Sequence, residues 1–211
     1  MTIGVVDYGI GNLLSVCRAV AVCGGNVKVL STPAEVPAVD RLVVPGVGAF
    51  GDCAAALRDQ GFWEPVVAFA ASERPFLGIC VGMQMLFDVG LEFGQHQGLG
   101  ILPGQVVEID RLRPDGTVRK RPHIGWVGLQ RPEGRTWEGT ILEGTDEGTK
   151  FYFVHTFSAV PEVTSDRLAD VDYDGFRVSA AVNRGNVTGT QFHPEKSGPA
   201  GLAVVSRFLK Q

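Results

Sequence analysis

The segment PFLGICVGMQ, residues 75–84, joins an apolar, strand-like run to a helix-like run, with Gly78, Cys80 and Gly82 at the junction. This spacing is that of a nucleophile elbow, in which the reactive residue lies on a sharp strand-to-helix turn and the glycines keep side-chain bulk away from it. A helix that begins at Val81 directs free N–H groups at the sulfur and favours the thiolate. The segment predicts a reactive, accessible thiol; the alternative is a small apolar residue at the end of a core strand.

Apolar runs alternate with helical patterns on both sides of this segment, which predicts an α/β fold with a mostly parallel sheet flanked by helices. The second half changes to strands joined by short polar turns, which adds an antiparallel region. No linker interrupts the chain, so we expect one domain over residues 1–211. The predicted strands are 3–8, 27–30, 42–46, 75–79, 104–109, 123–130, 151–155, 177–182 and 187–192, and the predicted helices cover about 12–23, 52–60, 63–71, 81–89 and 199–209.

The segment VTGTQFHPEKS, residues 187–197, places His193 and Glu195 two positions apart at the end of an alternating, strand-like run. Side chains at i and i+2 of an extended segment project to the same side, so the carboxylate can orient the imidazole. A cysteine, a histidine base and an orienting group form the set needed for attack on an acyl carbon, whatever their order in the chain. The sequence therefore predicts a triad of Cys80, His193 and Glu195.

Composition and charge narrow the class of protein. The formal net charge of −4 argues against a nucleic-acid binder, and four cysteines without CxxC spacing fit neither a small secreted framework nor a metal site. The first residues read as a strand and no apolar run is long enough to cross a bilayer, so we expect neither secretion nor membrane insertion. A cytoplasmic protein without a metal or another cofactor is predicted.

GVGAFG, residues 46–51, fits a dinucleotide-binding fingerprint letter for letter. That fingerprint also requires an acidic residue at the end of the next strand, and that strand ends in Cys80 instead. An oxyanion loop is the better interpretation, because glycines on both sides of Val47 leave its backbone N–H free to turn toward a developing negative oxygen. A plain glycine turn after a core strand fits equally well.

These residues together resemble a known family. GICVGMQ and QFHPEKS are similar to the class I glutamine amidotransferases, whose cysteine, histidine and glutamate release ammonia from glutamine. The segments VVDYGIGNL, VVPGVGAFGD, RPHIGW and FYFVHTF narrow the resemblance to the glutaminase subunits of imidazole glycerol phosphate synthases. The resemblance spans nearly the whole chain and implies a class I amidotransferase fold.

The resemblance also implies roles for residues outside the triad. Backbone N–H groups of Val47 and Val81 would form the oxyanion hole, and the glutamine substrate would be bound by Gly48, Gln84, Glu92, Thr156 and Phe157. The implied partner is a cyclase subunit with a (β/α)₈ barrel, forming a heterodimer in histidine biosynthesis. Its contacts are assigned to Asn12, His123, Trp126 and Lys196.

Several positions depart from the family pattern or lie outside it. Phe157 replaces a frequent tyrosine, Val127 a usual asparagine and Ser15 a second asparagine found in some relatives. His96 is expected in a loop and His155 in the core. Basic residues cluster between 111 and 121, where we expect a solvated hairpin, with partner docking as the alternative.

Two other functions stay open. The first is a glutaminase of another pathway, such as sugar amination or pyridoxal phosphate synthesis. The second is a regulatory relative without catalysis, against which the complete set of Cys80, His193 and Glu195 argues. Glutamate release with and without the cyclase distinguishes these possibilities.

Overall fold

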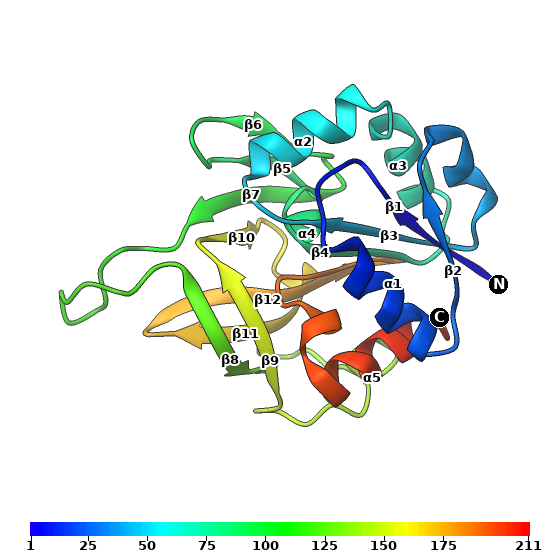
Figure 1. Ribbon diagram of the computed structural model, residues 1–211. Coiled ribbons are helices and arrows are strands. Elements are labelled where there is room, and N and C mark those ends of the chain that lie inside the picture. Colours follow the sequence, from blue (N-terminus) through cyan, green and yellow to red (C-terminus); the bar gives the residue numbers. More distant parts are fainter.

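The centre of the molecule is a seven-stranded mixed sheet (Figure 1), and the computed structural model describes every residue from 1 to 211. Its strands are β1 (Thr2–Val6), β2 (Asn26–Leu30), β3 (Arg41–Gly46), β4 (Phe76–Cys80), β11 (Arg167–Tyr173), β12 (Phe176–Arg184) and β13 (Val187–Thr190). Their order across the sheet is β11-β12-β13-β4-β3-β1-β2. The five strands from β13 to β2 run parallel. β12 is antiparallel to β13, and β11 is antiparallel to β12.

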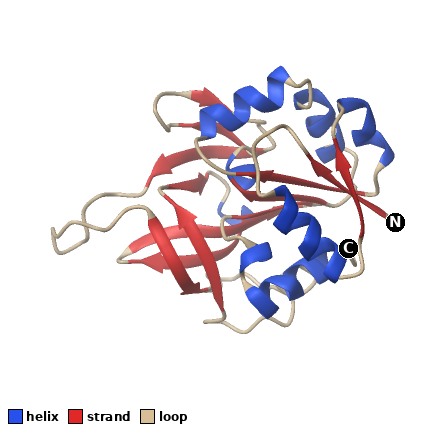
Figure 2. Cartoon of the chain, viewed as in Figure 1, coloured by secondary structure: helices blue, strands red, loops and turns tan.

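Helices cover both faces of this sheet (Figure 2), with α2 (Phe50–Asp59) and α3 (Trp63–Ala70) on one side and α1 (Leu13–Val22) and α5 (Gly198–Phe208) on the other. β3, β4 and β13 are buried along their whole length. β3 and β4 are mostly apolar because helices cover a parallel sheet on both faces, whereas β13, with the sequence VTGT, buries two threonines. No helix of the structure is both long and apolar enough to cross a membrane.

Two smaller sheets complete the fold. A four-stranded sheet has the order β10-β7-β5-β6, and β8 pairs with β9 as an antiparallel ribbon. Their bounds are β5 (Phe87–Gly90), β6 (His96–Gln97), β7 (Leu102–Glu108), β8 (His123–Gly128), β9 (Lys150–His155) and β10 (Phe157–Pro161). The predicted fold class, a mostly parallel sheet with helices and an antiparallel region in the second half, is confirmed. The strands β6, β10 and β11 were not predicted from the sequence, and His96, expected in a loop, lies in β6.

The helix predicted over 81–89 is wrong beyond its first turn. α4 covers only Val81–Gln84, and the chain then enters β5. The carbonyls of Met85 and Leu86 accept N–H groups from Leu99 and Ile101, so the following segment takes the place of a longer helix. A short apolar run fits a buried strand as well as a helix, and the sequence alone does not separate the two.

The predicted solvated hairpin of basic residues is only partly correct. A bridge between Leu112 and Val118 does close a hairpin, which protrudes from the molecule (Figure 1). Arg119, however, is 2% exposed and donates to the backbone carbonyls of Tyr173 and Asp174, at 3.1 and 3.0 Å. A buried guanidinium with three carbonyl partners, the third on Asp110, anchors the hairpin to the sheet.

The turn from β4 into α4 packs directly against β3. A Cβ built on Gly82 would lie 1.9 Å from the carbonyl oxygen of Val44, and one on Gly78 would lie 2.6 Å from the carbonyl oxygen of Gly82. Both close contacts are with backbone, which cannot swing aside as a side chain can. Glycine is therefore required at both positions by backbone approach rather than by backbone angle.

Replacing Gly82 by alanine is expected to lower the free energy of unfolding by about 3 kcal/mol, because the added methyl overlaps a strand carbonyl. The matched change Gly11→Ala, whose Cβ would meet only the Pro45 ring at 3.2 Å, is expected to cost less than about 1 kcal/mol. Urea denaturation of the two variants measures both values. Equal stabilities would contradict the packing described here.

Candidate active site

Cys80 ends β4 in a backbone conformation that few side chains adopt. Its φ of 55° and ψ of −111° place it outside the regions favoured by L-residues, and it is the N-cap of α4. Neighbouring strands hold this turn, because Cys80 is in register with Gly46 of β3. The residue is only 4% exposed, but it lines a cavity of about 390 Å³. The expected sharp turn is present, and access to the sulfur is through the cavity.

His193 and Glu195 lie beside each other just after β13. Nδ1 of His193 is 2.8 Å from Oε1 of Glu195, and the two side chains are 2% and 1% exposed. The segment is not extended as predicted, because a 3₁₀ turn, Pro194–Lys196, begins directly after the histidine. The turn brings the two side chains together all the same.

Backbone contacts fix the position of His193. Its N–H donates to the carbonyl of Tyr152 in β9 at 3.0 Å, and its own carbonyl accepts the hydroxyl of Ser197 at 2.7 Å. The Ser197 oxygen in turn accepts the N–H of Tyr152 at 3.0 Å. The imidazole is therefore held between the large sheet and the β8–β9 ribbon.

The electrostatic surroundings of His193 favour its charged form. Burial lowers the pKa of the imidazole, but the Cys80 sulfur and the Glu195 carboxylate raise it by more, to about 9. Nε2 of His193 is buried and makes no hydrogen bond. The imidazole can thus hold a proton next to the thiol, with one nitrogen oriented by Glu195 and the other free.

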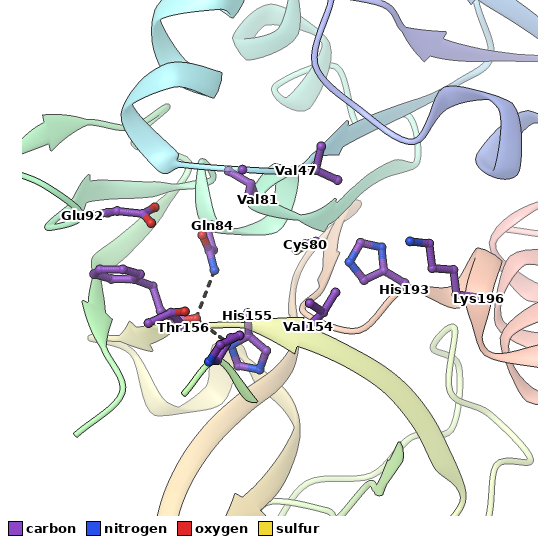
Figure 3. Close-up of a pocket in the computed structure, with 13 residues that line it drawn as sticks. Val47, Cys80, Val81, Gln84, Glu92, Val154, His155, Thr156, His193 and Lys196 are labelled. Carbon is purple, nitrogen blue, oxygen red and sulfur yellow. Dashed lines mark hydrogen bonds between the residues drawn. The ribbon is translucent and has the colours of Figure 1, made fainter. Parts of the chain in front are cut away.

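The cavity collects ten of the residues that the sequence predicted for this site (Figure 3). They come from the loop after β3, the end of β4, α4 and segments far apart in the chain. Its lining includes Val47, Gly48, Cys80, Val81, Gln84, Glu92, Thr156, Phe157, His193 and Lys196. Figure 3 shows His193 and Lys196 on one side of the cavity and Gln84 and Glu92 on the other.

Glu92 has a structural contact besides its place in the cavity. Its Oε2 accepts the backbone N–H of Phe50, at the first turn of α2, at 2.8 Å. A carboxylate at a helix N-terminus satisfies a free donor and favours the helix dipole. The predicted contact of Glu92 with an ammonium group therefore has to use the other face of the carboxylate.

Two side chains hold the loop that contains Val47. The Tyr8 hydroxyl donates to the carbonyl of Pro45 at 2.6 Å, and the Cys53 thiol donates to the carbonyl of Val47 at 3.2 Å. Burial raises the pKa of Cys53 to about 11, so its sulfur carries the proton that it donates. The peptide between Gly46 and Val47 lies between these two anchored carbonyls.

A chain of hydrogen bonds crosses the cavity floor. The carbonyl of Phe157 accepts from Nδ1 of His155 at 2.7 Å and from Nε2 of Gln84 at 3.2 Å (Figure 3). Nε2 of His155 is therefore the acceptor in its 3.0 Å contact with Nδ1 of His123. Burial lowers the pKa of His155 to about 3 and that of His123 to about 4, so both imidazoles are neutral at pH 7.

Sequence reasoning missed Gln191, which continues this chain. Its Oε1 accepts from Gln84 at 2.9 Å, and its Nε2 lies 3.6 Å from the Cys80 sulfur. The signal was its position two residues before His193, on the same side of an extended segment. His155 was predicted in the core; it is buried as expected, but it also lines the cavity.

The four residues assigned to a partner interface lie in different environments. Trp126 is 51% exposed and Lys196 is exposed, whereas Asn12 is half-buried and donates to Glu195 at 3.3 Å. The prediction that His123 contacts a partner directly needs correction. His123 is 1% exposed, because it stacks between the rings of Phe153 and Tyr173. It can support the interface strand from within but offers it no surface.

Comparisons with known proteins agree on one family. The model of the family "Glutamine amidotransferase class-I" matches residues 4–211. The chain is 48% identical over 210 residues to imidazole glycerol phosphate synthase subunit HisH 1 of Legionella pneumophila strain Lens, with 99% of each protein covered. It is 46% identical over 207 residues to the HisH subunit of Syntrophotalea carbinolica, with 97% of each covered.

Solved structures show the same fold at lower identity. The structure of PurLQS from Thermotoga maritima superimposes with a TM-score of 0.76 and 20% identity, over 99% of this chain and 97% of that one. A crystal structure described as a glutamine amidotransferase has a TM-score of 0.70 and 19% identity, over 99% and 97%. At this level of sequence identity, the similarity to these two structures shows a shared fold and nothing about function.

We expect the imidazole of His193 to titrate near pH 9 and Glu195→Gln to lower that midpoint, because the change removes a negative charge at Nδ1. The raised pKa means that the stability contributed by the charged imidazole is fully present below about pH 6.5 and is lost as the pH rises through about 9. NMR titration measures the midpoints, with His193→Asn to assign the signal. A midpoint below about 7 in the unchanged protein would contradict this electrostatic description.

Proposed function

Because the chain belongs to the class I glutamine amidotransferase family, we propose that it hydrolyses the side-chain amide of L-glutamine to glutamate and ammonia through Cys80, His193 and Glu195. One observation carries the proposal. A strained cysteine at the start of a helix shares a cavity with a histidine whose pKa the cysteine and a buried carboxylate raise to about 9. A thiol beside an oriented base is the arrangement required for nucleophilic catalysis on an amide.

The first half of the reaction breaks the amide bond. Nε2 of His193 holds the proton taken from the thiol, as its raised pKa favours, while the sulfur attacks the amide carbon. The developing oxyanion accepts the N–H of Val81 and an N–H of the loop at Val47 and Gly48. The tetrahedral intermediate collapses when His193 returns the proton to the leaving nitrogen, which departs as ammonia and leaves a glutamyl thioester.

The second half restores the thiol. His193, now neutral, takes a proton from a water molecule that attacks the thioester carbon. The carbon–sulfur bond breaks, glutamate leaves and the proton returns to the sulfur. Glu195 keeps Nδ1 protonated throughout, which fixes the imidazole so that Nε2 always faces the reacting atoms.

The remaining cavity residues bind the amino acid part of glutamine. Glu92 pairs with the α-ammonium, and backbone groups of Thr156 and Phe157 receive the α-carboxylate, for which the hydroxyl absent from Phe157 is not needed. Gln84 orients these groups through its bond to the Phe157 carbonyl. A cavity of about 390 Å³ is within the range of small-molecule sites.

Ammonia released here is consumed by a cyclase subunit with a (β/α)₈ barrel, which forms imidazole glycerol phosphate and AICAR in the cytoplasmic synthesis of histidine. The names of the relatives support this assignment. The partner covers the surface that includes Trp126 and Lys196, both of which are exposed, and Lys196 also lines the cavity. Asn12 contributes to this interface through its hydrogen bond to Glu195. His123 supports the interface from inside the fold.

The alternatives are a glutaminase of another pathway and a relative without catalysis. Relatives of nearly equal length that are named as synthase subunits favour the histidine pathway over sugar amination or pyridoxal phosphate synthesis. The close pairing of His193 with Glu195 argues against an idle relative. Glutamate release that fails to respond to the cyclase would favour another pathway.

Cys80→Ala is expected to abolish glutamate release and labelling by glutamine-like electrophiles, because no other cysteine lies in the cavity. His193→Asn is expected to cost about as much, since it removes the base, whereas Glu195→Gln leaves a larger residual rate because this group only orients and stabilises. Cys17→Ala and Cys23→Ala serve as controls that keep activity. Substantial glutamate release by Cys80→Ala would end the catalytic assignment.

Activity is expected to depend on the partner, because freely released ammonia would be protonated in water and wasted. The isolated subunit is expected to release glutamate slowly, and the cyclase with its bound nucleotide to raise the rate by at least about tenfold. The anchored carbonyls of Pro45 and Val47 leave the peptide between Gly46 and Val47 to turn toward the oxyanion in the complex. Equal turnover alone and in the complex would refute this gating and leave the triad untouched.

A further inference from the structure

Gln191 is a buried polar residue to which the proposed mechanism gives no part. It is 0% exposed, and both ends of its amide are occupied. Oε1 accepts from Gln84 at 2.9 Å, and Nε2 donates to the Cys80 sulfur at 3.6 Å, an ordinary length for a bond to sulfur. Burying a polar amide costs free energy of desolvation, so its presence here needs an explanation.

The orientation of the Gln191 amide follows from the backbone. The carbonyl of Phe157 can only accept, so the group that Gln84 directs at it must be the NH₂. The same NH₂ faces Gln191, which therefore presents its oxygen to Gln84 and its own NH₂ to the sulfur. The Phe157 carbonyl, two side chains away, therefore determines that an N–H donor faces Cys80. Turning the amide of Gln84 or of Gln191 would leave two donors or two acceptors facing each other.

We propose that Gln191 is a positioning residue that holds the Cys80 sulfur in its attacking direction and stabilises the thiolate over the thiol. A neutral N–H donor gains more from a full negative charge on sulfur than from a thiol. It also differs from His193, because it exchanges no proton and so keeps its N–H available to the sulfur whenever the thiolate forms, before attack and on release from the thioester. The consequence of this inference, attack by the thiolate, rests on the proposed function. Its test does not.

The other groups near the sulfur stay the same when Gln191 is changed. They are His193 from the segment after β13, Tyr8 from the loop after β1 and Cys53 from α2, whose titrations respond to Cys80. His155, Glu92 and Lys196 line the same cavity. A change in thiolate formation that follows a substitution at Gln191 therefore reports the lost donor.

Two substitutions test the proposal through alkylation of Cys80 by iodoacetamide, followed against pH and assigned to this cysteine by peptide mass. Gln191→Leu removes the donor, and we expect the midpoint of alkylation to rise by about one pH unit and the rate at neutral pH to fall about tenfold. Gln191→Glu keeps an acceptor for Gln84 but places a carboxylate at the sulfur, so its midpoint should rise further. If Gln191→Leu does not fold, Gln191→Met, which has a similar length and no N–H donor, provides the measurement.

Thr190→Val is the matched control, because Thr190 is the preceding residue, is 0% exposed and its hydroxyl has no hydrogen-bond partner. It is expected to leave the midpoint unchanged. A merely structural role would lower the melting temperature of the Gln191 variants without moving the midpoint, and that result would overturn the proposal. Glutamate release by Gln191→Leu should recover as the pH rises, because thiolate then forms without the donor.

Alkylation needs no glutamine, so the two hypotheses fail separately. A protein that alkylates with the predicted shift but releases no glutamate would lose the proposed function and keep this inference. A protein that releases glutamate normally and whose alkylation midpoint is the same with glutamine, leucine or glutamate at position 191 would keep the function and lose the inference.

Discussion

The site depends on one constraint, the close contact between the turn after β4 and the backbone of β3. Gly82 lies so near the carbonyl of Val44 that no side chain fits, and this contact holds Cys80 at a φ of 55°. Such a conformation costs about 1–3 kcal/mol and persists only where the surroundings impose it. Here the fully buried strands β3, β4 and β13 impose it, so the sulfur stands at the carboxyl edge of the sheet, where open parallel sheets bind their ligands. The rest of the cavity is arranged around that fixed atom.

A second fixed point is the carbonyl of Phe157. It accepts one bond from His155 and one from Gln84, and these two donors determine the orientation of the imidazole of His123 and the amide of Gln191. Peptide oxygens cannot exchange roles as hydroxyls or amides can, so one such atom at the centre removes the ambiguity from the whole chain. The chain begins in β8, beneath the exposed Trp126, and ends at the sulfur. The four side chains along it, those of His123, His155, Gln84 and Gln191, are buried, which makes the loss of one of these hydrogen bonds costly.

The sequence predicted those features that depend on local pattern. Alternation and helical periodicity identified the parallel strands and all four of the longer helices, α1, α2, α3 and α5, and the spacing of glycines around Cys80 identified the turn. Features that depend on competition between distant segments were missed. The run after Gln84 forms β5 because the segment around Leu99 supplies its hydrogen bonds. His123 is buried because Tyr173, from another sheet, stacks on it. The sequence around Gln84 or around His123 does not indicate which distant segment will pack against it.

The residues of the proposed triad and those around them belong to two different parts of the fold. Cys80 and His193 adjoin the central strands of the seven-stranded sheet, whereas the segment from His155 to Phe157 joins the two-stranded β8–β9 ribbon to the smaller sheet. His193 bridges the two parts, since its N–H donates to Tyr152 of the ribbon. Displacement of the ribbon therefore acts on the histidine, through this bond, and on the Phe157 carbonyl that orients Gln84 and Gln191. Trp126, where we propose that the partner docks, belongs to this ribbon, so the proposed docking acts first on the groups around the nucleophile and not on the strand that carries it.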